Sequence, residues 1–181
     1  MNGPAAQAPT ASDFLGQNRM PYDAFDRLPH TPIVVKNATL QLGIAPGKLA
    51  LSPDRIRSWV EHSATVVASY YGQFPVASVR ILVVPVDGRG VRGGTTWAYR
   101  GAAIRLLLGS QASEDDLKED WIIVHEMVHL ALPKRPWCTF AIACEQSRVF
   151  SAVASCWKTY PAKCLSDLVG CQQHLREQPQ S

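Results

Sequence analysis

Cysteine is absent from residues 1–137, and all five cysteines of the 181-residue chain lie at or beyond Cys138. An odd number of cysteines at irregular spacings makes a poor disulfide framework, and no C-x-x-C pair is present to suggest a structural zinc knuckle. We therefore expect the cysteine-containing stretch to be either a separate small lobe or a part whose evolutionary history differs from that of the rest.

Long apolar runs and clusters of basic residues are missing as well. No stretch reaches the roughly 18 apolar residues of a membrane-spanning helix. The net charge of +3 comes from basic residues interleaved with acids, so neither a membrane nor a nucleic acid is expected as a partner. The first ten residues lack a charged region followed by an apolar one, so no secretory signal is expected there, and the cellular location stays open.

The residues that are present suit a folded domain. Hydrophobic residues make up 46% of the chain and charged residues 18%, which is enough for a substantial core in one globular domain. Four prolines among small and polar residues indicate that residues 1–30 form a flexible segment or an extended strap. We expect a folded lobe over residues 31–135 and a small segment over residues 136–181.

Two helices are indicated by their start signals. Ser52 followed by Pro53 is a strong N-terminus, and this helix is expected to end at Gly72. Ser113, with an acid three residues later, is the expected N-cap of a second helix. The second helix is predicted to run without interruption as far as Pro133.

β-branched and alternating residues predict the strands. They are expected at 32–42 (one strand, or two that break near Asn37), at 79–86, at 95–99 and at 102–108. Residues 87–94 fit the pattern G-x-G-x-x-G, but a dinucleotide-binding turn needs a helix directly after its glycines. The residues that follow are β-like, so the glycines are expected to form a flexible loop.

The run from Trp121 to Leu132 is apolar except for His125, Glu126 and His129. Burying a neutral polar group without a partner costs about 2–7 kcal/mol, so each of these side chains needs a strong partner. On a helix, residues four apart share a face, so the H-E-x-x-H spacing allows both histidines to bind one Zn²⁺ while Glu126 reaches a water molecule. The alternative is a pair of core histidines bonded to carbonyl or carboxylate groups, beside an incidental glutamate.

The order of strand, helix, strand, hairpin and H-E-x-x-H helix resembles the N-terminal lobe of the zincin metallopeptidases over residues 32–135, particularly the thermolysin-like gluzincins. Residues 122–131 match the longer zincin pattern of uncharged residues around both histidines. Lys134 and Arg135 follow at the distance found in the glycyl aminopeptidase family. The fold class implied is α+β: a small twisted sheet with an edge strand, helices packed on it, and a short, mainly helical or irregular C-terminal segment.

The resemblance implies zinc-dependent hydrolysis of peptide bonds in a peptide or protein substrate, with an aminopeptidase as one form. His125 and His129 would hold the Zn²⁺, and Glu126 would act as general base. Residues 102–108 would form the edge strand that binds an extended peptide through its main chain. The side chains lining the substrate cleft would be Thr96, Trp97 and Tyr99. Both aromatic residues also fit an ordinary, half-buried hairpin.

Gluzincins take a third zinc ligand from a glutamate on a later helix, and the resemblance assigns this role to Glu145. Tyr160 is the corresponding candidate for a phenol that stabilises the oxyanion, unless its role is only structural. The other residues of 136–181 do not match the helical lobe of that family, so an atypical or truncated C-terminal part is expected. An incomplete site would leave the alternative function, noncatalytic binding of a metal ion or peptide.

Overall fold

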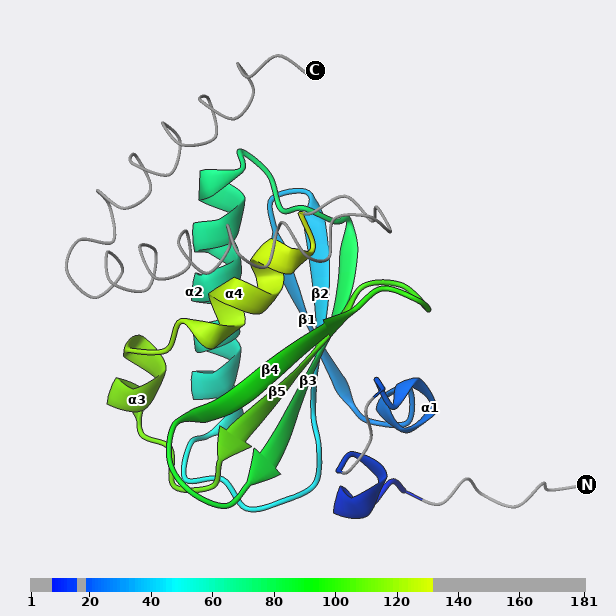
Figure 1. Ribbon diagram of the computed structural model, residues 1–181, viewed down its shortest axis with the longest axis vertical. Coiled ribbons are helices and arrows are strands. Elements are labelled where there is room, and N and C mark those ends of the chain that lie inside the picture. The colour runs from blue at the N-terminus through cyan, green and yellow to red at the C-terminus, as the bar shows by residue number, and fades with distance from the viewer. Residues whose placement is uncertain (1–7, 16–18, 132–181) are drawn as a thin grey trace, which may run out of the picture. The chain divides into compact units, whose positions relative to one another are not determined.

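The computed structural model describes residues 8–15 and 19–131. The chain divides into two units, Met1–Ala131 and Leu132–Ser181, and the described residues all belong to the first. This unit combines a five-stranded mixed sheet with helices (Figure 1), so the predicted α+β class is confirmed there. None of the helices in this part of the chain is long and apolar enough to span a bilayer.

The sheet contains two parallel pairs at its centre and an antiparallel pair at each side. Its strands are β1 (His30–Val35), β2 (Ala38–Ile44), β3 (Ser78–Val86), β4 (Val91–Trp97) and β5 (Ala103–Gly109). Their order is β1-β2-β3-β5-β4, in which β2, β3 and β5 are parallel and the outer strands β1 and β4 are antiparallel to their neighbours. Helix α2 (Pro53–Tyr70) makes the crossover that the parallel pair β2 and β3 requires.

The predictions for residues 32–42 and 87–94 have different outcomes. The two-strand alternative for 32–42 is confirmed, because β1 and β2 are separated by a turn in which Lys36 has a φ of 49°. The flexible loop over 87–94 is wrong in part, since β4 begins at Val91 and includes Gly93 and Gly94.

The prediction that residues 102–108 form the edge strand is wrong, because β5 lies between β3 and β4. The physical reason is the composition of the two strands. A strand inside a sheet covered on both faces needs apolar side chains on both sides, and every side chain of β5 (AIRLLLG) except Arg105 meets that condition. Strand β4 (VRGGTTW) has little apolar surface and therefore occupies the edge.

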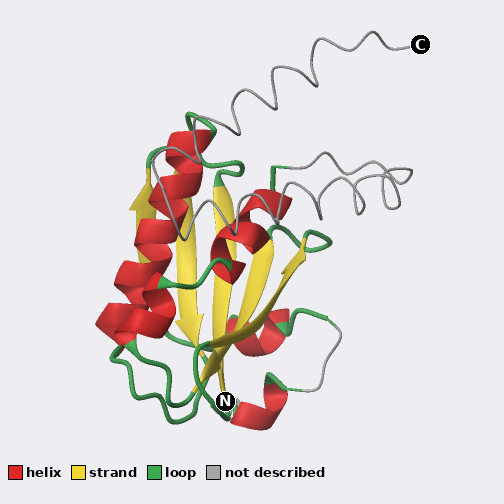
Figure 2. Cartoon of the chain, turned by 60° about the vertical axis from the view of Figure 1, so that its left-hand side comes forward, coloured by secondary structure: helices red, strands yellow, loops and turns green. Residues whose placement is uncertain are grey.

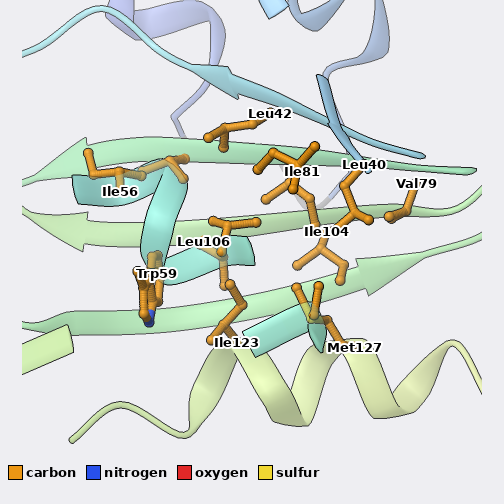
Figure 3. Packing of buried hydrophobic residues seen from close by; sticks show 14 of the residues in the cluster. Leu40, Leu42, Ile56, Trp59, Val79, Ile81, Ile104, Leu106, Ile123 and Met127 are labelled. Carbon is orange, nitrogen blue, oxygen red and sulfur yellow. The ribbon is translucent and has the colours of Figure 1, made fainter. Parts of the chain in front are cut away.

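Helices α2 and α4 (Ile122–His129) cover one face of the sheet (Figures 1 and 2). Helix α2 begins as predicted, with the Ser52 hydroxyl accepting from the Arg55 N–H at 3.4 Å. Figure 3 shows the core between these layers, where Ile123 and Met127 of α4 lie against the sheet. Both side chains are fully buried, and each stabilises the fold by about 1.5–3 kcal/mol.

The N-terminal residues cover the opposite face of the sheet. A 3₁₀ turn, η1 (Ala11–Asp13), and helix α1 (Tyr22–Phe25) bring Phe14 and Phe25 into full burial beside Leu82 and Val84 of β3. The described part of residues 1–30 is therefore packed on the sheet, unlike the flexible segment expected. The reason is that β3 is apolar on both faces, so its second face also needs apolar cover.

The predicted second helix is divided into α3 (Glu114–Lys118) and α4. The cap at Ser113 is confirmed, because its hydroxyl accepts from the Asp116 N–H at 3.2 Å. The uninterrupted helix is wrong: the buried Asp120 carboxylate accepts from the N–H groups of Ile122 and Ile123 at 3.1 and 3.2 Å, which starts a new helix. Helix α4 ends at His129, and Pro133 lies outside the described residues.

Burial raises the pKa of Asp120 from 3.8 to about 6, although the two N–H groups that bond to it act in the opposite direction. The folded state therefore binds this proton more tightly than the unfolded state, and the contribution of Asp120 to the free energy of unfolding falls as the pH rises from about 4 to about 6. The full effect is at most about 3 kcal/mol. Asp120→Asn, which keeps an acceptor for the helix start, should remove this pH dependence in urea unfolding.

The control is Gly93→Ala on β4, because the added Cβ meets nothing within 4 Å and the change involves no ionisable group. The difference in free energy of unfolding between wild type and Gly93→Ala should not change across the same pH range. If the difference in free energy of unfolding between wild type and Asp120→Asn is also independent of pH, Asp120 does not titrate differently in the folded and unfolded states.

Candidate metal centre

His125 and His129 project from the same side of α4 because residues four apart lie one above the other on a helix. Their Nε2 atoms are 3.0 Å apart, and their ring planes are nearly perpendicular, with centroids separated by 4.6 Å. Ile123 and Met127 anchor the opposite side of α4 in the core and so fix its rotation. The two ring nitrogens therefore converge on one point beside the helix.

This geometry fits two ligands of a single tetrahedral ion. Zinc–nitrogen bonds of about 2.0–2.1 Å at a tetrahedral angle place two ligand nitrogens about 3.3 Å apart, close to the separation of the two Nε2 atoms. Burial lowers the pKa of His125, and the charge of a protonated His129 lowers it further. A lowered pKa favours the neutral imidazole, which is the form that binds a metal ion.

Trp121 lies one turn before His125 on the same side of α4. The two rings meet edge to face, with centroids 5.2 Å apart and an angle of 83° between their planes. Trp121 is 37% exposed, so it lies beside His125 at the surface of the described part of the chain. Its contact restricts the orientation of the His125 ring, and it was not among the residues that the sequence pointed to.

Glu126 faces strand β4 and is only 7% exposed. The Thr96 hydroxyl lies 2.6 Å from Glu126 Oε2 and 2.9 Å from the main-chain carbonyl oxygen of Glu126, and it can donate to either. Burial raises the pKa of Glu126, while the Thr96 hydroxyl and a charged His129 act to lower it. A carboxylate with a raised pKa is better matched to proton transfer near neutral pH.

Gly94 permits the close approach of β4 to α4. A Cβ atom placed on Gly94 would lie 2.5 Å from Glu126 Cγ and 3.0 Å from Ile122 Cγ2, so no larger residue fits without movement. Gly94 and Thr96 are two residues apart on a strand and therefore face the same way. The sequence alone showed only a glycine-rich stretch, because the need for a missing side chain arises from packing against a helix distant in the sequence.

The three residues expected to line a substrate cleft do not come together. Thr96 contacts Glu126, whereas Trp97 points to the other face of the sheet, where the Arg105 guanidinium lies 5.1 Å from its ring centroid. Tyr99 follows the strand and packs on Tyr22 with centroids 5.2 Å apart. The Tyr99 hydroxyl also donates to the main-chain oxygen of Met20 at 3.2 Å. Both aromatic side chains thus lie on the face of the sheet that the N-terminal residues cover.

Glu145 and Tyr160 lie outside the described residues. Within residues 8–15 and 19–131, no group of three His, Cys, Asp or Glu side chains is arranged to hold a metal ion. Comparison with known proteins finds no family model and no curated protein that matches the chain. The case for a metal centre therefore depends on two converging imidazoles and an adjacent buried carboxylate.

The two neighbouring glycines of β4 provide a test of this close packing. Gly94→Ala places a methyl group against Glu126 and Ile122 and should lower the free energy of unfolding by about 1–3 kcal/mol. Gly93→Ala is the matched control because a Cβ there meets nothing within 4 Å, and its effect should stay within about 0.5 kcal/mol. Urea unfolding of both variants measures the difference, and equal effects would contradict the contact between β4 and α4.

Proposed function

We propose that this chain is a zinc-dependent peptidase of the zincin type. His125 and His129 would provide two ligands for Zn²⁺, and Glu126 would be the general base. The observation that carries the proposal is the 3.0 Å approach of the two Nε2 atoms on one side of α4, with the buried Glu126 carboxylate on the same helix. The same 3.0 Å separation also suits a hydrogen bond between two neutral imidazoles, so the zinc content of the protein decides between a metal site and a structural pair.

The proposed reaction consumes one water molecule for each peptide bond that is broken. When bound, zinc would lower the pKa of water toward about 7 and polarise the scissile carbonyl. Glu126 accepts a proton from the attacking water and then delivers it to the nitrogen of the leaving amine. The products are a carboxylic acid and an amine, and Glu126 returns to its starting state.

The peptide substrate would bind along β4, in place of the strand that the sequence suggested. Helix α4 contacts β4 directly (Figure 1), and the outer side of β4 has no neighbouring strand in the described sheet. An extended peptide can pair with such an edge through main-chain hydrogen bonds. Binding there would bring the scissile bond close to Glu126 and the two histidines.

Glu145 remains the proposed third ligand, and Tyr160 the proposed phenol that stabilises the oxyanion. Three protein ligands and one open position are the usual composition of a catalytic zinc site, because the open position receives water or substrate. A chain that lacks the third ligand would be a noncatalytic domain that binds metal or peptide. The experiments below distinguish this second function from the first.

The purified full chain should contain about one zinc ion per molecule, measured by inductively coupled plasma mass spectrometry. His125→Ala and His129→Ala should each reduce the zinc content at least tenfold after dialysis, because each removes one of two neighbouring ligands. His62→Ala is the control, since this histidine is exposed on α2. Retention of zinc in both ligand variants would refute the proposed site.

Glu126→Gln should lower the rate of peptide hydrolysis by about 10²–10⁴-fold, because the amide cannot accept the proton of the attacking water. The zinc content should remain that of the wild type, which separates a chemical defect from loss of the metal. Full activity of Glu126→Gln would disprove the assignment of the base. Zinc binding without any hydrolysis by the wild type would instead favour the noncatalytic domain.

A further inference from the structure

We propose that Thr96 is the positioning residue for Glu126: from the edge strand, its hydroxyl holds the carboxylate in the orientation that proton transfer requires. The catalytic meaning of this inference rests on the proposed function. The contact itself does not, because both residues are described and joined by a hydrogen bond. Thr96 would thus act through Glu126, in place of the substrate-lining role that its position in the sequence suggested.

The Thr96 hydroxyl lies within hydrogen-bond distance of two acceptor atoms of Glu126. Thr96 Oγ1 lies 2.6 Å from the carboxylate and 2.9 Å from the main-chain oxygen of Glu126. A threonine hydroxyl has one hydrogen, so it donates to one of these acceptors at a time. The shorter distance to Oε2 is typical of a charge-assisted hydrogen bond, about 2.5–2.7 Å. The carboxylate is therefore the stronger acceptor.

The sheet holds the hydroxyl more rigidly than α4 holds the carboxylate. Thr96 pairs with Ile104 of β5, a fully buried residue, and its branched side chain has few rotamers. Glu126 has a longer, unbranched side chain that could adopt several orientations in an open space. Its Cγ atom lies against Gly94, and its carboxylate bonds to Thr96, so strand β4 restricts both parts of the side chain.

This arrangement separates the orientation of the base from the binding of substrate. The Thr96 hydroxyl is directed toward α4, whereas a peptide added to the sheet would use main-chain groups at the open side of β4. Loss of the hydroxyl should therefore reduce kcat with little change in KM. A residue that lined the cleft and contacted substrate would instead change KM.

The test compares Thr96→Val and Thr96→Ser in the full chain loaded with zinc, using a peptide substrate. Thr96→Val keeps the shape of the side chain and loses the hydroxyl, so kcat should fall about 10–100-fold, as expected when a catalytic group is misplaced. KM should change by less than about twofold. Thr96→Ser keeps the hydroxyl and should restore kcat to within about threefold of the wild type.

The control is Thr65→Val on α2, which removes a hydroxyl that donates to the Glu61 carbonyl oxygen at 2.8 Å, away from the site. It should leave kcat and KM unchanged. The inference is overturned if Thr96→Val keeps the wild-type kcat, if its defect lies in KM alone, or if Thr96→Ser is as impaired as Thr96→Val. If Thr96→Val does not fold, Thr96→Ala replaces it with the same expected split between kcat and KM.

A double-mutant cycle tests the contact without any assay of activity. Thr96→Val and Glu126→Ala, alone and together, should show a coupling of at least about threefold in the equilibrium constant of unfolding. Independent effects would refute the contact and the inference with it. If the wild type hydrolyses no peptide but the coupling is present, the proposed function fails, while the positioning of Glu126 by Thr96 stands.

Discussion

The burial of Ile123 and Met127 beneath the sheet is the constraint on which the candidate site depends. These side chains fix the rotation of α4, and this rotation places His125 and His129 at a partly exposed side of the helix and not in the core. Asp120 sets where the helix begins by accepting from its first free N–H groups. The buried Ile123 and Met127 side chains and the Asp120 carboxylate together determine where the two imidazoles lie.

The same packing produces the electrostatic character of the site. A carboxylate as deeply buried as Glu126 is costly unless it is hydrogen-bonded, and β4 meets this requirement with the Thr96 hydroxyl and the space left by Gly94. Burial also favours the neutral form of His125. The contacts that make the buried Glu126 and His125 side chains tolerable in a folded domain are therefore also those on which the proposed metal binding and proton transfer depend.

The layers of the fold follow from the apolar content of its central strands. Strands β3 and β5 carry buried apolar side chains on both faces, so helices are needed on one side and the N-terminal segment on the other. This leaves the glycine- and threonine-containing β4 at the edge, directly beside α4. An edge of low side-chain bulk beside a polar helix face is the arrangement that our proposal requires for an extended peptide.

Local signals were sufficient for several elements of the fold. Residue type at the helix start was enough to place the caps at Ser52 and Ser113. Periodicity was enough for the strands β3 and β5 and for the shared helix face of His125 and His129. All of these features depend on residues close in the sequence. The order of β4 and β5, the helix start at Asp120, the burial of Phe14 and the roles of Gly94 and Thr96 were decided by the tertiary structure. Each of these depends on a partner distant in the sequence, and only packing determines which face a side chain meets.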